Sequence, residues 1–293
     1  MTENTRYETA LKYAIIATTI SFGIEVAGSM FSGSLSLLSD AGHMLRDVLA
    51  LMLSFGAITV AHRLPTKTKT FGYHRVEILV ALFNGIFLIF LGAWILWEAV
   101  IRFAHPISVN SQIMLPVAIV GLIVNVAVAL TLLGSQDVNI RSAFVHVLGD
   151  TVASVGVIAA AIWITFTGQV WVDPVLSAVI ALVIIASSVS ILRETIGILL
   201  QFTPPGIHFD AVVKDIESVP GVSGVHNVHL WSLCSNINIL DAHIYSCDPD
   251  VVNLEQIKQE IRHRLEKYMI RYSVLEFECE ECPGCTIVKE LRD

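Results

Sequence analysis

Long apolar segments alternate with short polar ones along the first two thirds of the chain. Six windows are each apolar enough and long enough to cross a bilayer as a helix, which takes roughly 20 mostly apolar residues. They lie at about 11–31, 36–61, 77–101, 113–133, 142–166 and 174–201. The breaks between them are short and carry turn residues, such as SGS after the first and HPISVN after the third. The pattern predicts six transmembrane helices.

The pattern changes after Gln201, at FTPPGIHFD. Apolar positions with helical spacing are followed by two segments of alternating polarity, a second helical pattern and a last alternating segment. The predicted helix, two strands, helix and strand lie at 209–218, 225–233, 237–245, 253–268 and 273–280. This αββαβ order is typical of a small α+β domain whose helices cover one face of its sheet.

We therefore expect a polytopic α-helical membrane protein with a C-terminal α+β domain. Residues 1–207 would form the six-span transmembrane domain, and residues 208–293 the separate C-terminal domain. In the Asp173-Pro174 pair before the last span, Asp is the expected cap of that helix and Pro its first residue.

The composition agrees with a membrane protein. The chain is 54% hydrophobic and only 15% charged, with a mean hydropathy of +0.69, whereas a soluble domain is about 25% charged. The net charge of −8 is concentrated in the C-terminal part. No cluster of Lys and Arg is large enough for a nucleic-acid surface, so nucleic-acid binding is excluded as a function.

The distribution of basic residues predicts the orientation in the membrane. The loop between the second and third windows carries Arg63, Lys67, Lys69 and Arg75, whereas the first and fifth connections carry no Lys or Arg. Because basic loops remain in the cytoplasm, this loop, both termini and the C-terminal domain are expected there. All five cysteines lie in the C-terminal domain, and their odd number favours a reducing compartment. We expect a multi-pass protein of the cell (inner) membrane.

Two His-x-x-x-Asp motifs lie inside predicted spans. His43 and Asp47 are in the second window, and His146 and Asp150 in the fifth. Residues four apart share one face of a helix, and ionisable residues within a span are expensive and mark function. Two such faces together offer two imidazole nitrogens and two carboxylate oxygens, a set suited to Zn²⁺, with Co²⁺ or Cd²⁺ as competitors. A local His–Asp hydrogen bond within each helix is the alternative.

Three further charged residues lie near these motifs. Glu25, one window earlier, either supports the metal site or pairs with Arg46 or Lys12. Asp40 reads as an acid at the start of its helix. The role of Arg46, which is adjacent to Asp47 in the sequence, is left open.

The chain resembles the cation diffusion facilitator family of zinc transporters over essentially its whole length. The segments that carry the resemblance are SLSLLSDAGHMLRD, FGYHRVEIL and HVLGDTVASVGV. It implies a dimeric, bacterial-type transporter that exports Zn²⁺ against an inward flow of protons. The implied transport site is His43, Asp47, His146 and Asp150. The position that Gln201 occupies here is often acidic in the family, so the resemblance does not carry a charge contact with Arg75 over to this chain.

The resemblance also implies a zinc site in the C-terminal domain, with His226, His243 and Glu280 as ligands. From strand alternation, His226 and His229 are expected to point to opposite sides of the sheet, with His229 in the core or an interface.

The C-terminal CEECPGC segment contains Cys282-x-x-Cys285, which has the spacing of zinc ligands. Metal binding, a redox pair and no special role are all left open for these two cysteines.

The sequence thus favours a Zn²⁺/H⁺ antiporter, and not an enzyme. Its expected partners are divalent metal ions, protons, the lipid bilayer and a second copy of the chain. A membrane-anchored zinc sensor and an intramembrane metalloenzyme are the alternatives. No HExxH motif, the pattern expected of such an enzyme, occurs in the chain.

Overall fold

The structure, a computed structural model, describes residues 3–61, 65–132, 138–235, 237–246, 250–279 and 286–288. Some side chains within these helices lie outside the description, at 3–15, 47, 50–61, 131–132 and 138–146. The chain divides into two compact units. One contains residues 1–56 and 83–192, and the other residues 57–82 and 193–293.

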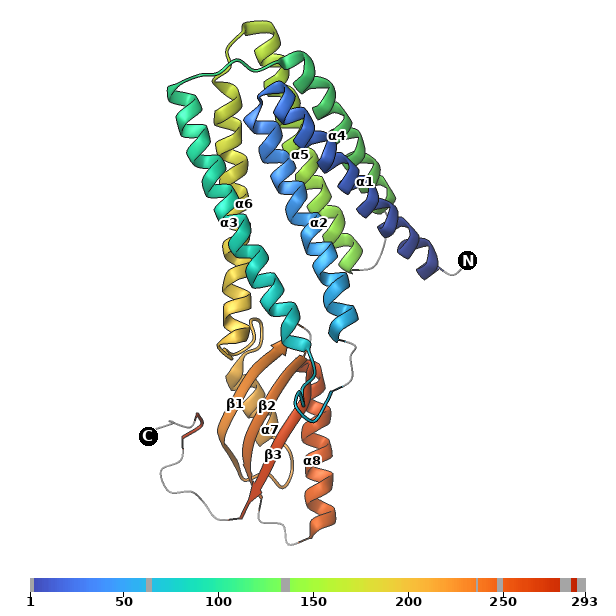
Figure 1. Cartoon of the computed structure of the whole chain (residues 1–293). Coiled ribbons are helices and arrows are strands. Elements are labelled where there is room, and N and C mark those ends of the chain that lie inside the picture. The colour runs from blue at the N-terminus through green and yellow to red at the C-terminus, as the bar shows by residue number, and fades with distance from the viewer. Residues whose placement is uncertain are drawn as a thin grey trace. The chain divides into compact units, whose positions relative to one another are not determined.

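Six long helices lie among the described residues of the first two thirds of the chain, in agreement with the six predicted windows. They are α1 (Glu3–Ser32), α2 (Leu35–Ala61), α3 (His74–Ala104), α4 (Ser111–Leu132), α5 (Val138–Thr167) and α6 (Val172–Leu199). Several extend past the predicted windows, because the helical backbone continues into the polar residues that flank the apolar segments. In the first unit, α4 packs against both α1 and α5 (Figure 1).

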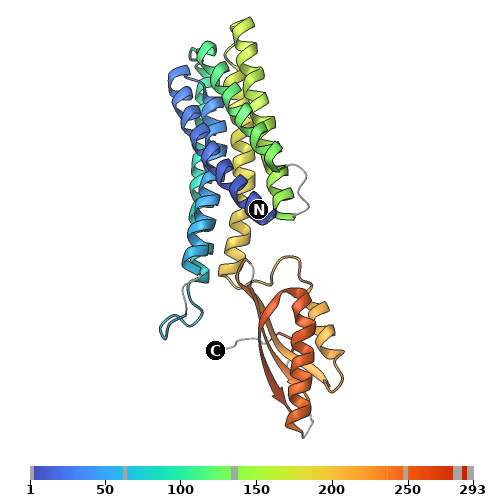
Figure 2. The same cartoon turned by 90° about the vertical axis from the view of Figure 1, so that its right-hand side faces the viewer.

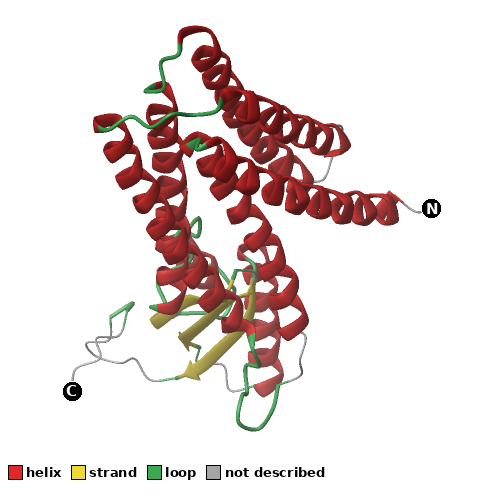
Figure 3. Cartoon of the chain, turned by 45° about the horizontal axis from the view of Figure 1, so that its top comes forward, coloured by secondary structure: helices red, strands yellow, loops and turns green. Residues whose placement is uncertain are grey.

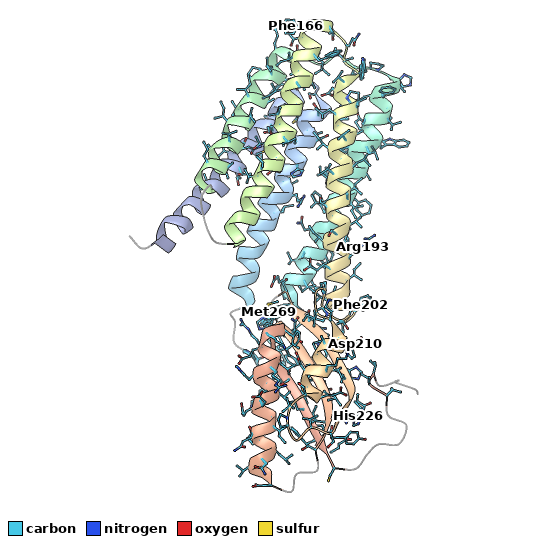
Figure 4. All side chains as sticks on the ribbon, turned by 180° about the vertical axis from the view of Figure 1, so that it is seen from behind. Phe166, Arg193, Phe202, Asp210, His226 and Met269 are labelled. Atoms are coloured by element: carbon cyan, nitrogen blue, oxygen red, sulfur yellow. The ribbon has the colours of Figure 1, made fainter. Side chains whose placement is uncertain are left out.

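Four of these helices, α3 to α6, are long and apolar enough to span a bilayer when the described residues alone are considered. The described part of α1 is a shorter apolar helix, Ile16–Ser32. Large apolar side chains point outward, as lipid contact requires; Phe166 near the end of α5 is 85% exposed (Figure 4). The prediction of a polytopic helical membrane protein is confirmed.

The expectation that Asp173 caps its own helix was wrong. Asp173 lies in the first turn of α6, but its carboxylate accepts hydrogen bonds from the start of α2. The donors are the hydroxyl groups of Ser34 and Ser36 and the backbone N–H groups of Leu35 and Ser36. The first N–H groups of a helix have no partner within it, so a carboxylate from a neighbouring helix satisfies them.

The C-terminal part has the predicted αββαβ order. Its elements are α7 (Phe209–Glu217), β1 (Gly224–Cys234), β2 (Ile237–Tyr245), α8 (Val251–Leu265), the 3₁₀ turn η1 (Glu266–Tyr268) and β3 (Ile270–Glu278). β2 lies in the centre of the sheet, antiparallel to β1 and parallel to β3 (Figure 3). β3 begins three residues before its predicted start, because Ile270 already pairs with Asn238.

Both α7 and α8 cover the same face of this sheet (Figure 2). Val212 and Ile216 of α7 and Ile261 of α8 are buried with Leu240 and Ile244 of β2 in one apolar core. Because side chains alternate along a strand, the other residues of β2 point to the opposite face. That second face carries Asp241, His243 and Tyr245.

A bulge at Asn227 shifts the alternation of β1. His226 pairs with His243, but His229 pairs with Asp241, so three steps on β1 correspond to two on β2. Asn227 takes up the extra residue with a φ of 49°, a left-handed conformation that Asn tolerates better than most residues. Directly paired residues share a face of the sheet. His226 and His229 therefore lie on the same face, and the prediction that they point to opposite sides was wrong.

Candidate metal centres

His43 of α2 and Asp150 of α5 meet within the first unit. His43 Nδ1 lies 3.2 Å from Asp150 Oδ1, and the two residues are only 9% and 8% exposed. Two ligand atoms on one tetrahedral Zn²⁺, each at about 2.0–2.2 Å from the metal, are roughly 3.4 Å apart. The two motifs therefore approach each other at a distance that suits shared coordination.

The other two predicted ligands of this site, Asp47 and His146, lie on α2 and α5, but their side chains are outside the described residues. A hollow of about 630 Å³ opens beside the described pair. His43, Arg46, Asp150 and residues of α6 such as Leu176 and Val183 line it.

The two charged residues near His43, Arg46 and Asp40, form hydrogen bonds to other helices. Arg46 donates from Nη1 to Ser187 Oγ on α6 at 3.0 Å, which gives its cation a partner away from α5. Asp40, only 3% exposed, accepts a 3.0 Å hydrogen bond from Ser154 Oγ on α5. Asn125 of α4 donates to the same Ser154 at 3.1 Å. Asp40 is therefore part of a buried interhelical network rather than an acid at a helix start.

A second group of metal-ligating side chains lies on the open face of the C-terminal sheet. One ligand atom from each of His226, His243 and Glu278 lies within 4.8 Å of the other two. The Glu278 carboxylate reaches both rings, with Oε1 at 2.6 Å from His243 Nδ1 and Oε2 at 3.2 Å from His226 Nε2. Glu276 Oε2 lies 3.5 Å from His243 Nε2. His226, labelled in Figure 4, is 5% exposed. Its ring stacks on that of Tyr245.

Two imidazoles and a carboxylate are a donor set that Zn²⁺ accepts, so the residues of this cluster fit a zinc ion. Glu278 was not predicted as a ligand, although strand alternation places it on the same face as the predicted Glu280. The pairing of Tyr245 with Glu278 is what brings its carboxylate to the two histidines. Glu280, Cys282 and Cys285 lie outside the described residues.

The short segment Thr286–Val288 lies along the edge of β1 at the bulge. Asn227 N donates to Thr286 O at 3.2 Å, and Val228 N donates to Ile287 O at 2.7 Å. Val288, His229, Trp231 and Asp241 line a hollow of about 660 Å³. The half-buried His229 therefore faces this hollow and lies outside the three-residue cluster.

Arg75 and Gln201 line one pocket of about 340 Å³ within the second unit. Arg75 Nε is buried, and it has no hydrogen-bond partner among the described residues. Gln201 has a φ of 59° at the end of α6, where Phe202 N donates to Gly197 O.

The chain matches the models of two known domain families. The family model of the cation efflux transmembrane domain matches residues 11–200, and that of the cation efflux protein cytoplasmic domain matches residues 204–275. The chain belongs to the cation efflux family. The resemblance to cation diffusion facilitators is thereby confirmed, and the chain is a multi-pass membrane transporter of divalent cations rather than an enzyme.

Curated relatives are similar over most of their length. The chain is 38% identical over 262 residues to a cadmium, cobalt and zinc/H⁺-K⁺ antiporter of Bacillus subtilis, covering 88% of this chain and 84% of the relative. It is 36% identical over 281 residues to the metal cation efflux system protein CzcD of Cupriavidus metallidurans, covering 94% and 88%. It is 39% identical over 275 residues to the zinc transporter ZitB of Pectobacterium atrosepticum, covering 92% and 85%.

Proposed function

We propose that this cation efflux protein exports Zn²⁺ from the cytoplasm in exchange for protons. Its transport site consists of His43, Asp47, His146 and Asp150. The observation that carries the proposal is the 3.2 Å approach of His43 to Asp150 between two buried positions of different helices. A buried His and Asp within a span are costly, and a transported metal ion that both side chains bind accounts for their presence.

The donor set determines which metals bind. Two imidazole nitrogens and two carboxylates suit Zn²⁺, and Co²⁺ and Cd²⁺ bind the same donors. Relatives named for zinc, cobalt and cadmium transport support this range.

The same donors explain the exchange for protons. A metal ligand must be deprotonated, so metal and protons compete for the same atoms. Unperturbed histidine titrates near 6.5, close to cytosolic pH. Deprotonated His43 and His146 receive Zn²⁺ from the cytoplasmic side. The helices then expose the site to the other side, where protons displace the metal, in the alternating-access cycle of secondary transporters.

Several properties follow for the whole molecule. The protein is an inner-membrane homodimer with both termini in the cytoplasm, as the basic loop at Arg63–Arg75 predicts. The domain boundary lies near residue 207, between the two matched family regions.

The C-terminal cluster is a second zinc site that senses the cytoplasmic metal. His226 and His243 provide two ligands, and a carboxylate of Glu278 or the predicted Glu280 provides a third. Cys282 and Cys285 are candidates for further ligands. Zinc bound there strengthens the dimer by its higher affinity for the closed arrangement, which is a population shift. A protein that only sensed zinc would leave the paired ligands of α2 and α5 without a role.

Zinc flux into proteoliposomes under an imposed pH gradient tests the transport site. Wild type should move Zn²⁺ in the direction opposite to the proton flow. Asp150→Ala and His43→Ala should abolish the zinc flux. His105→Ala is the matched control, because this exposed histidine lies beyond the end of α3 and should transport normally.

Unchanged zinc flux in Asp150→Ala would refute the site. Zinc movement that ignores the proton gradient would refute the exchange. Normal zinc binding with no flux in the wild type would instead favour a sensor.

A further inference from the structure

A second acidic side chain lies deep in the membrane unit, outside the proposed ligand set. Glu25 of α1 is 1% exposed. Neither of its carboxyl oxygens has a hydrogen-bond partner among the described residues, and the same holds for the hydroxyl of Ser21 one turn earlier. A buried carboxylate without hydrogen bonds or a cation is strongly disfavoured in its charged form.

The helix that packs on α1 leaves room for this carboxyl group and offers it no charge. A Cβ added to Gly121 of α4 would overlap Glu25 Oε1 and lie 3.2 Å from Glu25 Cδ. Residues 111–132 of α4 include no Asp, Glu, His, Lys or Arg. Glu25 therefore points into a glycine notch on an uncharged helix.

The charge that faces Glu25 is also negative. Asp40 of α2 is close enough for the two carboxyl groups to interact electrostatically. Arg46, the one Arg or Lys of α2, donates to Ser187 on α6 instead. Lys12 precedes Glu25 by 13 residues on α1, which is about 20 Å along a helix. Two neighbouring buried carboxyl groups cannot both ionise easily, so one of them holds a proton.

We propose that Glu25 carries a proton that Zn²⁺ binding at the transport site expels, in addition to the protons lost by the metal ligands. This inference rests on the proposed function. Asp40 connects the two sites, because it interacts electrostatically with Glu25 and also with His43 and Asp150. The added positive charge of Zn²⁺ favours the Glu25 carboxylate. Its O–H bond breaks, the electron pair stays on oxygen and the proton leaves to water.

Counting protons released on zinc binding tests the proposal. The full-length protein is titrated with Zn²⁺ by calorimetry in buffers of different ionisation enthalpy at neutral pH. Glu25→Gln keeps the shape of the side chain but has no proton to lose, so it should release about one proton fewer per Zn²⁺ than wild type. Glu25→Asp retains a carboxyl group and should restore the count. Glu98→Gln is the control, since Glu98 is paired with Arg102 at 2.8 Å, and should match wild type.

An unchanged proton count in Glu25→Gln would overturn the proposal. Loss of zinc binding in Glu25→Gln with normal binding in Glu25→Asp would make Glu25 a metal ligand, which also overturns it. Infrared difference spectra report the protonation of the carboxyl group without the Glu25→Gln variant. Zinc should remove a carboxylic-acid band from the spectrum of wild type, and Glu25→Asp should shift that band. Normal transport by His43→Ala or Asp150→Ala would refute the transport site itself, whatever Glu25→Gln does.

Discussion

The carboxylate of Asp173, in the first turn of α6, accepts a 2.7 Å hydrogen bond from the backbone N–H of Leu35, the first residue of α2. It also accepts from the N–H and hydroxyl groups of Ser36 and from the hydroxyl group of Ser34. Asp173 is 1% exposed, so no water replaces these bonds. One carboxylate thus holds the start of the helix that carries His43 against α6.

Replacing this carboxylate should destabilise the membrane unit. Asp173→Ala leaves several buried donors without an acceptor, and each such donor costs about 1–3 kcal/mol. We expect a clearly lower midpoint of thermal unfolding for the purified protein in detergent. Ser177→Ala is the control, because the Ser177 hydroxyl only donates to a carbonyl within α6. Equal midpoints for Asp173→Ala and wild type would contradict the prediction.

The identity of the carboxylate in the C-terminal zinc site is open to a direct test. In an Asp150→Ala background, where the transport site is impaired, Glu278→Gln should weaken zinc binding. The loss should be at least the roughly 10- to 100-fold that follows removal of a residue supporting a metal ligand. Calorimetry or competition with a chelator measures it. Glu280→Gln is the matched comparison, and a larger loss in that variant would return the ligand role to Glu280.

The bulge at Asn227 should be necessary for the pairing of His226 with His243. Asn227→Gly accepts the positive φ of this position and should preserve zinc binding by the C-terminal domain. Asn227→Val places a β-branched residue in the left-handed region, at a cost of about 1–2 kcal/mol, and should weaken binding. Zinc titration of both variants in the Asp150→Ala background tests this. Equal zinc affinities of the two variants would argue against a role of the bulge in zinc binding.

Gln201 occupies a left-handed position that favours glycine. Gln201→Gly should therefore stabilise the end of α6 by about 1 kcal/mol. Gln201→Ala removes the same amide but keeps the strain, so it serves as the control. Thermal unfolding should place the midpoint of Gln201→Gly above that of Gln201→Ala. A midpoint of Gln201→Ala at or above that of Gln201→Gly would contradict the role of backbone strain at this position.

An ion-paired cluster that joins α7 to the 3₁₀ turn should make stability depend on pH. Lys267, with Nζ at 2.5 Å from Asp215 Oδ2, and the Tyr268 hydroxyl lower the pKa of Asp215. A lowered pKa in the folded state adds stability above the unfolded value of about 3.9, and this stability is lost as the pH falls through the folded value.

Asp215→Asn should therefore lower the unfolding midpoint at pH 7 and match wild type more closely near pH 3. Glu217→Gln, at an exposed position of the same helix, should change the midpoint little at either pH. A difference between Asp215→Asn and wild type that is independent of pH would show that the carboxylate charge is not responsible.

Much of the fold was predictable because its signals are local. The apolar windows located all six long helices, and polar alternation located both β1 and β2. The ends were less accurate: α8 stops at Leu265 and continues as the 3₁₀ turn Glu266–Tyr268, and β3 begins at Ile270. Helix ends and strand starts depend on the partners of individual backbone groups, which a pattern of apolar residues does not reveal.

The sequence by itself determined which residues can act together on one element. Helical spacing places His43 with Asp47 and His146 with Asp150, and strand alternation places Asp241 with His243. Only the tertiary structure decided the contacts between elements: His43 with Asp150, Asp173 with the start of α2, and Glu278 with His226. The physical reason is that backbone periodicity is set within a few residues, whereas helix packing and a single-residue bulge depend on the whole fold.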